Sequence, residues 1–485
     1  MRPPVSAPSL FDGYSLGAAY DEMFAEDLEP RGPYVPLHRR LGRLTADDLD
    51  QRQREADEAF LHRGITFTVY GDTEGTEKIF PYDVVPRLLT ASEWETIERG
   101  LAQRIAALNQ FLADVYGPGQ ILNDGVVPRR LVLSSANYRR EMRGVRVPMD
   151  RYVSVAGIDL VRLPDGQFAV LEDNLRVPSG VSYMLTNRHV MRNVFPKLFE
   201  HYHIRSVDRY PSDLYTTLTE LARDLPHDPT IALLTPGVYN SAYFEHAFLA
   251  RQTGMELVEG RDLVVHDNVV YMRTTAGLRR VDVIYRRIDD DFLDPIPFRS
   301  DSALGVAGLF NAYRAGNVIL ANAIGTGVAD DKAIYAYVPD IIRYYLHEEP
   351  VLQNIETYLL DRAEDRAYVL DHLAELVVKA VDESGGYGML IGPQATAEQI
   401  EAFRKQILAE PRRYIAQPTL ALSAAPCFLD GRIVPRHVDF RPYVLYGSTV
   451  RIAPGGLTRV ALKAGSLVVN SSQGGGSKDT WVLDA

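Results

Sequence analysis

The sequence has a single cysteine and no long apolar run. Because Cys427 is alone among 485 residues, an internal disulfide and a metal site built from several cysteines are both excluded. No stretch of about 18 apolar residues occurs, so no transmembrane helix is expected. The first residues, MRPPVSAPSLFDGYS, lack the apolar segment of a signal peptide. These absences predict a cytoplasmic protein that does not enter a membrane.

Basic residues are outnumbered by acidic residues. The chain has 52 Lys and Arg against 64 Asp and Glu, and a net charge of −12 at pH 7. This balance argues against a protein that binds nucleic acid regardless of sequence, so no nucleic-acid partner is expected. Apolar residues make up 46% and charged residues 24%, as in ordinary globular proteins. The length suits two or three domains, and the oligomeric state cannot be read from it.

The segment FAVLEDNLRVPSG, residues 168–180, begins like a buried strand and then turns acidic. Upstream, YVSVAGIDLVRL ends shortly before Asp165-Gly166, a strong turn signal, so the two runs predict a β-hairpin. A two-residue turn pairs Pro164 with Gln167. The same register pairs Asp159 with Glu172.

Side chains alternate along a strand, so this register places Phe168, Val170, Glu172 and Asn174 on one face, joined by Asp159. Two carboxylates directly opposite each other repel, and a divalent cation between them removes the conflict. Mg²⁺ prefers carboxylate and amide oxygens and usually also holds substrate phosphates. The pattern therefore predicts a metal site made of Asp159, Glu172 and Asn174. An exposed polar strand end, or a register that differs by one residue, would explain the same residues.

A second segment, VVKAVDESGGYGMLIGP, residues 377–393, predicts a strand ending at Lys379, a glycine-rich loop and another strand. Gly385, Gly386 and Gly388 allow close backbone approach to a ligand. Loop N–H groups can cradle phosphates, and the lysine adds a positive charge. The loop is not a P-loop, and it is not a dinucleotide-binding fingerprint because it leads into a strand. An ordinary turn is the alternative.

Three further places carry polar residues in suggestive positions. Asp331 and Lys332 begin a helical pattern, and Gln417 ends a short β-like run before Pro418. Arg436, Asp439 and Arg441 follow one another in strand-like order in RHVDFRPYVLYG. Each of these is more often structural than functional when taken alone. Residues 70–87 are rich in charge and turn formers, which suggests a substrate loop or, more commonly, a surface loop.

Together these segments resemble the circularly permuted type 2 ATP-grasp family, which is related to the ATP-grasp domain of glutathionylspermidine synthase. The most specific pieces are EDNLRVPSG, TPGVYNSAYFEHAFLA, YRRIDDDFLDP, GNVILANAIGTGVADDK and VVKAVDESGGYGMLIGP. In ordinary ATP-grasp proteins the lysines come before the metal ligands. Here the Glu-x-Asn motif precedes Lys332 and Lys379, which marks the permutation. In glutathionylspermidine synthase an Arg stands two residues before the metal-binding Asp, whereas this chain has Gly157.

The resemblance implies an α+β fold, a circularly permuted ATP-grasp with a small inserted α/β domain of pre-grasp type. It implies roles for the residues above: Asp159, Glu172 and Asn174 as metal ligands, Lys332, Lys379, Gly385, Gly386, Gly388 and Gln417 in nucleotide binding, and Arg176 with Glu172 in catalysis. The expected segments are an irregular and helical N-terminus (1–60), the metal-binding part of the core (61–205), the insert (206–300) and the nucleotide-binding lobes (301–485).

The function that the resemblance implies is a carboxylate–amine ligase. Such an enzyme uses ATP with Mg²⁺ or Mn²⁺ to make an acyl phosphate, which an amine attacks to give an amide, ADP and phosphate. The expected partners are therefore a small-molecule or peptide carboxylate and an amine. Two other functions stay open: an ATP-binding partner protein without turnover, and a phosphotransferase with another acceptor. The sequence names neither substrate.

Overall fold

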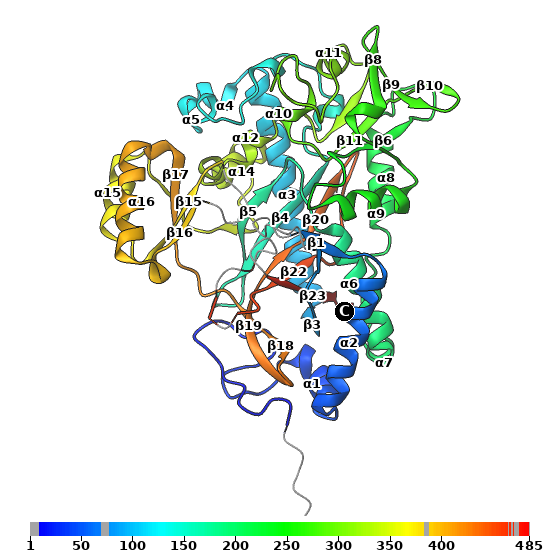
Figure 1. Ribbon diagram of the computed structural model, residues 1–485. Helices are drawn as coiled ribbons and strands as arrows, with labels where there is room; N and C mark the ends of the chain where they lie inside the picture. The colour runs from blue at the N-terminus through cyan, green and yellow to red at the C-terminus, as the bar shows by residue number, and fades with distance from the viewer. Residues whose placement is uncertain are drawn as a thin grey trace, which may run out of the picture.

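A ten-stranded mixed sheet lies at the centre of the computed structural model, which describes residues 9–68, 77–382, 388–463, 465–466, 469 and 475–484 (Figure 1). Its main path runs β13-β5-β4-β19-β22-β23-β3, while β18 pairs with β19, and β20 pairs with β4 and β21. The strands are β3 (Tyr82–Leu89), β4 (Val155–Arg162), β5 (Phe168–Asn174), β13 (Gln353–Asn354), β18 (Ala424–Leu429), β19 (Arg432–Arg441), β20 (Tyr443–Tyr446), β21 (Val450–Ile452), β22 (Leu457–Val460) and β23 (Gly476–Val482). The sheet thus joins strands from two separate parts of the chain.

The long helix α3 (Ala91–Tyr116) packs against this sheet and carries much of the largest hydrophobic cluster. It begins at Thr90, whose hydroxyl accepts from the Glu93 N–H, while the Glu93 carboxylate accepts from the Thr90 N–H. This Thr-x-x-Glu capping box satisfies N–H groups that the first turn leaves unpaired. Shorter helices around it are α4 (Gln120–Asn123), α5 (Arg129–Leu133), α12 (Gly327–Asp330), α13 (Lys332–Tyr335) and α14 (Val338–Leu346).

A four-stranded sheet of order β12-β11-β6-β7 is parallel throughout. Its strands are β6 (Ile231–Leu234), β7 (Glu256–Val258), β11 (Val283–Arg286) and β12 (Ile319–Ala321), accompanied by α8 (Tyr210–Leu221), α9 (Tyr243–Thr253), α10 (Asp290–Leu293) and α11 (Leu309–Arg314). All residues of β6 and β11 are buried, as expected for parallel strands covered on both faces. The expected α/β insert ends at residue 300, yet this sheet also takes β12. An antiparallel sheet of β8 (Leu263–His266), β9 (Val269–Thr274) and β10 (Gly277–Arg280) lies at the upper edge of Figure 1.

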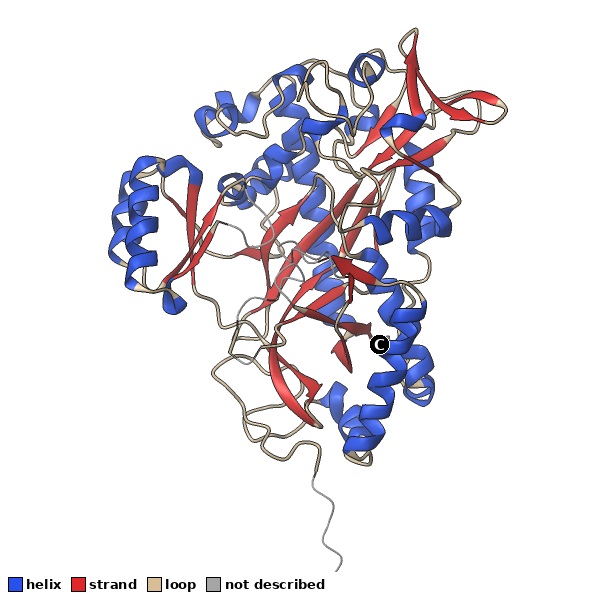
Figure 2. Cartoon of the chain, viewed as in Figure 1, coloured by secondary structure: helices blue, strands red, loops and turns tan. Residues whose placement is uncertain are grey.

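A separate lobe beside the central sheet has its own hydrophobic cluster (Figures 1 and 2). It consists of a sheet of order β14-β17-β15-β16 and two helices on the outer face of that sheet. The elements are β14 (Tyr358–Leu359), β15 (Leu376–Ala380), β16 (Met389–Ile391), β17 (Tyr414–Pro418), α15 (Ala363–Asp371) and α16 (Ala397–Ala409). The strand, loop and strand expected at residues 377–393 are therefore confirmed, with Lys379 opposite Met389 in antiparallel register.

The N-terminal part forms α1 (Val35–Leu41), α2 (Ala46–His62), β1 (Thr66–Thr68) and β2 (Glu77–Ile79), and α2 contacts α6 (Val181–Val194), which is followed by α7 (Pro196–His201). The expectation of a loop at residues 70–87 is wrong for residues 77–79, which lie in β2, and for residues 82–87, which lie in the fully buried strand β3. The charges there are buried as ion pairs: Lys478 lies 2.7 Å from Asp83, and Arg87 lies 2.5 Å from Glu22. Residues 69–76 lie outside the described residues. Among the described helices, none combines the length and apolarity needed to cross a membrane.

Candidate active site

Asp159 lies directly opposite Glu172 on the antiparallel strands β4 and β5, as the sequence predicts. The turn contains three residues rather than two, because the Leu163 N–H donates to the Gln167 carbonyl at 2.8 Å. The expected pairing of Pro164 with Gln167 is therefore wrong. A β-bulge in the middle of the hairpin compensates for the longer turn and restores the expected register at Asp159 and Glu172.

The same bulge changes which side chains share a face. Phe168 and Val170 lie in the large cluster beside α3. Asp173 also points toward α3, where Arg104 donates to it at 2.6 and 2.7 Å. Because neighbouring side chains of a strand point to opposite faces, Glu172 points away from α3. The expected common face of Phe168, Val170 and Glu172 is therefore wrong.

The charge of Asp159 is balanced by two arginines. Arg441 donates to both oxygens of Asp159, at 2.5 and 2.8 Å, and Arg459 donates to one of them at 2.8 Å. Burial alone would raise the pKa of Asp159, but Arg441 and Arg459 outweigh it and lower the pKa to about 2. Arg459 also binds Asp439, whose pKa is raised by burial. The repulsion that the sequence suggested between the two carboxylates is therefore relieved by protein cations, without requiring a metal ion.

The predicted metal ligands still suit a hard cation. A carboxylate offers about four acceptor positions, and the hydrogen bonds to Asp159 use three of them. The Glu172 side chain keeps 24% of its surface exposed. Asn174 ends the same strand: its Oδ1 is the atom that could bind a cation, and its buried Nδ2 has no hydrogen-bond partner among the described residues. Within the described residues there is no group of three or more His, Cys, Asp or Glu placed to hold a metal ion, but the predicted set combines two carboxylates with an amide.

Lys379 and Gln417 face the central sheet from the separate lobe. Alternation along β15 buries Leu376, Val378 and Ala380 in the lobe's own cluster and turns Lys379 to the other face. Its ammonium donates to Gln417 Oε1 at 2.7 Å, and Gln417 Nε2 donates to Thr357 Oγ1 at 3.0 Å. Burial lowers the pKa of Lys379 to about 8, with Glu172 opposing and Lys332 adding to the shift.

Lys332, the first residue of α13, also lies near Glu172. Asp331 caps α13 by accepting from the Ala333 N–H at 2.9 Å, which confirms the expected helix start. Lys332 Nζ then lies 3.9 Å from Glu172 Oε1. Lys332, Lys379 and Glu172 therefore converge, although they come from three separate segments. Their nucleotide-binding and metal-binding roles remain predictions.

The glycine-rich loop is described only in part. Gly385 and Gly386 lie outside the described residues. Gly388 has φ of +63°, a conformation that favours glycine, and its carbonyl accepts from the Ala380 N–H at 3.3 Å. The expected contact of this loop with phosphates thus remains a prediction.

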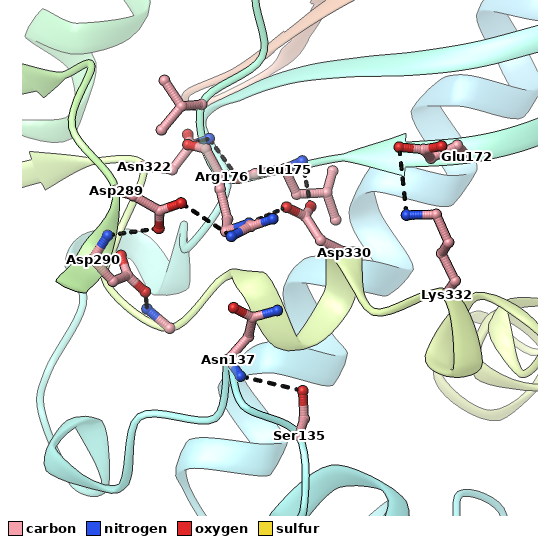
Figure 3. A network of polar contacts seen from close by, with 12 residues as sticks. Ser135, Asn137, Glu172, Leu175, Arg176, Asp289, Asp290, Asn322, Asp330 and Lys332 are labelled. Carbon is pink, nitrogen blue, oxygen red and sulfur yellow. Dashed lines mark hydrogen bonds and ion pairs between the residues drawn. The ribbon is translucent and has the colours of Figure 1, made fainter. Parts of the chain in front are cut away.

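Arg176 lies in a network with two carboxylates (Figure 3). Its guanidinium contacts Asp330 at 2.7 Å and Asp289 at 3.0 Å, and these neighbours raise its pKa despite burial. Asp330 also accepts from the Leu175 N–H at 2.5 Å. Burial raises the pKa of Asp330 to about 6, although Arg176 opposes the shift. Figure 3 shows Glu172 with Lys332 on the far side of Asp330, so in this structure Arg176 is engaged away from that pair.

Sequence reasoning missed the partners that fix these groups. It noted Arg441 and Asp439 only for their alternation on a strand, and it did not single out Arg459 or Asp330. Arg459 lies on β22, which neighbours β19 in the sheet, and it is directly opposite Asp439. The available signal was an arginine inside the short β-like run LTRV. An arginine that is buried in a strand requires a carboxylate partner.

Comparisons with known proteins agree on the family. The model of the family described as circularly permuted ATP-grasp type 2 matches residues 86–461. A protein of Synechocystis is 55% identical over 97% of this chain and 98% of its own length, and a protein of Mycobacterium tuberculosis is 53% identical over 99% of this chain and 88% of its own. The chain belongs to the circularly permuted ATP-grasp type 2 family.

Two further similarities concern proteins with more specific names. A protein of Frankia alni named as a putative glutamate–cysteine ligase is 45% identical over 99% of this chain, which spans 55% of that relative. A solved structure of a glutathione synthetase-like effector from Globodera pallida has a TM-score of 0.61 at 10% identity, and the match covers 91% of this chain and 98% of the effector. The structural match supports the expected α+β ATP-grasp fold.

Proposed function

We propose that this chain, as a circularly permuted ATP-grasp protein, is a ligase that joins a carboxylate to an amine. The γ-phosphoryl group of ATP is transferred to a carboxylate oxygen, which gives an acyl phosphate and ADP. The amine nitrogen then attacks the acyl carbon, the C–O bond to phosphate breaks, and a proton leaves the nitrogen. The products are an amide, ADP and phosphate.

One arrangement carries this proposal. Lys379 from the separate lobe and Lys332 from α13 interact electrostatically with Glu172, which comes from the hairpin of the central sheet. Phosphoryl transfer needs mainly positioning and positive charge around the phosphates. The two lysines supply that charge, and the pKa of Lys379, about 8, keeps it mostly protonated at neutral pH. Gln417 holds Lys379 in place and supports the predicted position of the nucleotide.

Asp159, Glu172 and Asn174 are the residues that would hold Mg²⁺ or Mn²⁺. When bound there, such a cation would neutralise charge on the phosphate oxygens. Arg441 anchors Asp159 through two hydrogen bonds and thereby orients its carboxylate. Arg176 is the predicted cation for the acyl phosphate, a role that requires it to exchange Asp289 or Asp330 for a new partner.

The relatives are consistent with an amide-forming reaction. The Frankia protein is named for a ligase that joins an amino acid to another, but this chain spans only 55% of it. Its name therefore supports a ligase and does not assign glutamate or cysteine as substrates. Cytoplasmic residence also stays a prediction.

A second function, an ATP-binding partner without turnover, is favoured by one observation. Both oxygens of Asp159 already accept hydrogen bonds from arginines, as expected for a carboxylate that serves the structure. The two functions differ in their products. A ligase releases ADP and phosphate when a suitable carboxylate is present, and hydroxylamine converts its acyl phosphate into a hydroxamate. A partner protein binds ATP and gives neither product with any carboxylate.

A further inference from the structure

A polar cavity lies beside the Arg176 network, between the segment that follows α5 and the segment that follows α10. Its volume is about 600 Å³, and its lining includes Leu133, Tyr138, Arg139, Arg140, Phe298 and Arg299. We refer to it as the Tyr138 cavity. Small-molecule sites commonly have volumes of about 300–1,000 Å³. Of the described residues assigned to ATP or metal binding above, none lines it.

The start of α10 connects this cavity to the Arg176 network. Asp289 contacts Arg176 at 3.0 Å, and Asp291, two residues later, contacts Arg139 at 2.7 Å. Between them, Asp290 accepts from the Gly325 N–H at 2.9 Å, which ties this turn to the core. Figure 3 shows Asp289 and Asp290 next to Arg176. A ligand in the cavity is thus separated from Arg176 by one turn of chain.

Three arginines line the cavity, together with two carboxylates, Glu141 and Asp291. The Arg139 side chain is only 14% exposed and is held by Asp291, so it is fixed in position. Arg140 and Arg299 are 87% and 53% exposed, and their carboxylate neighbours are Glu141 at 3.4 Å and Asp301 at 2.7 Å. Guanidinium groups bind carboxylates and phosphates through paired hydrogen bonds. Because the arginines outnumber the lining carboxylates, and Arg140 and Arg299 are exposed, the cavity suits an anionic group.

The cavity also has an aromatic wall. The rings of Tyr152, Tyr116 and Tyr138 form a stack, with centroids 5.8 and 5.3 Å apart and planes within 13° of parallel. Tyr138 is the outer ring of this stack and lines the cavity. Leu133 also lines the cavity and is 47% exposed, so it offers apolar surface to a ligand. A rigid ring beside exposed apolar surface favours a ligand with an aromatic or apolar group.

We propose that the Tyr138 cavity binds the far end of the carboxylate substrate, a free carboxylate next to an aromatic or apolar side chain, as at the C-terminus of a short peptide. The assignment as a substrate rests on the proposed ligase function, whereas the binding requires no turnover. A substrate that also reacts beside Glu172 needs a second carboxylate, which a peptide with an acidic residue supplies, and this favours peptides as the substrate class.

Isothermal titration calorimetry of the full chain with Ala-Ala-Tyr, without ATP, tests this inference. The peptide acid is expected to bind, and its C-terminal amide is expected to bind much more weakly. The Arg140→Ala/Arg299→Ala double variant should weaken binding by about fivefold or more, the scale of two exposed ion pairs. The matched control is Arg146→Ala, an exposed arginine of the same segment that does not line the cavity. Tyr138→Ala should weaken binding as well.

Failure of this inference differs from failure of the ligase function. Equal binding of acid and amide, no binding of either, or full binding by the double variant would overturn the cavity assignment. Inorganic phosphate that displaces the peptide at equal concentration would overturn the choice of a carboxylate. Peptide binding of the expected pattern would sustain the cavity assignment whatever the outcome for the ligase, because the one carboxylate of Ala-Ala-Tyr occupies the cavity and leaves none to be phosphorylated.

Discussion

The side-chain ammonium of Lys379 and the amide oxygen of Gln417 are 2.7 Å apart on adjacent strands of the separate lobe. The hydrogen bond stabilises a lysine whose burial would otherwise favour its neutral form. It also holds the ammonium on the side of the lobe where Glu172 and Lys332 are its charged neighbours. A phosphate that binds Lys379 must therefore share its ammonium with Gln417 or displace Gln417 from it.

Replacement of either lysine by alanine is expected to weaken ATP binding. Loss of a charge-assisted contact costs about 1.5–3 kcal/mol, or roughly 10–150-fold in affinity. Lys332→Ala and Lys379→Ala should both show this loss in calorimetric titrations with ATP. Lys405→Ala is the matched control, because Lys405 lies on α16 of the same lobe and its side chain is 75% exposed. Unchanged affinity in both lysine variants would remove them from the nucleotide site.

ATP affinity is expected to fall as the pH rises through about 8. Burial lowers the pKa of Lys379 to about 8, so above this pH the lysine loses the proton that attracts phosphate. Binding measured without metal between pH 7 and 9.5 should decline in the natural sequence. It should vary much less in Lys379→Ala, which already lacks the charge. A parallel decline in both proteins would assign the pH dependence to another group.

Arg441→Ala is expected to destabilise the fold by about 3 kcal/mol, because it removes the main partner of a buried carboxylate. Among the described residues, Asp159 would then keep one ion-pair partner, Arg459. Chemical denaturation should show the loss, and Arg432→Ala, an exposed position on the same strand, should change stability by less than about 0.5 kcal/mol. If added Mg²⁺ restores part of the lost stability, the result supports the predicted metal site. A variant as stable as the natural protein would contradict the role of Arg441 as an anchor.

Asp330 should make stability depend on pH in the opposite sense to an ordinary paired carboxylate. Burial raises its pKa from 3.8 to about 6, so the folded state holds its proton more tightly than the unfolded state. This contribution is fully present below about pH 4 and is lost as the pH rises through about 6. The free energy of unfolding of the natural protein, relative to Asp330→Asn, should therefore fall between pH 4 and 6.5. A constant difference across this range would rule out the shifted pKa.

The hairpin illustrates what the sequence can and cannot predict. Alternation and the Asp165-Gly166 turn signal placed both strands correctly, and Asp159 does lie opposite Glu172. The bulge that lies between the turn and this pair was not predictable, because FAVLEDN contains no Gly or Pro to mark an irregularity in the strand. The sequence therefore predicted the partner of Glu172 correctly but placed its side chain on the wrong face of the sheet.

A second limit of prediction from the sequence concerns residues that are far apart in the chain and meet in the fold. The helix start at Asp331 and the strand ending near Lys379 follow from local patterns, and both are present. Local patterns do not reveal that Arg441 and Arg459 neutralise Asp159, because these residues lie about 280 and 300 positions away. Only the family resemblance suggested that such distant residues meet. The resemblance indicated that Lys332 and Lys379 lie near Glu172, but it did not indicate the arginines that bind Asp159.

The most direct test of the proposed ligase is product analysis of ATP turnover with a library of carboxylates in the presence of hydroxylamine. The natural protein should form ADP, phosphate and a hydroxamate with at least one carboxylate. Glu172→Gln should abolish product while remaining folded, since the change keeps the volume of the side chain, and Glu410→Gln, at an exposed position of the separate lobe, should keep activity. AMP and pyrophosphate, full activity of Glu172→Gln, or ATP binding without any product across the library would contradict the proposed reaction.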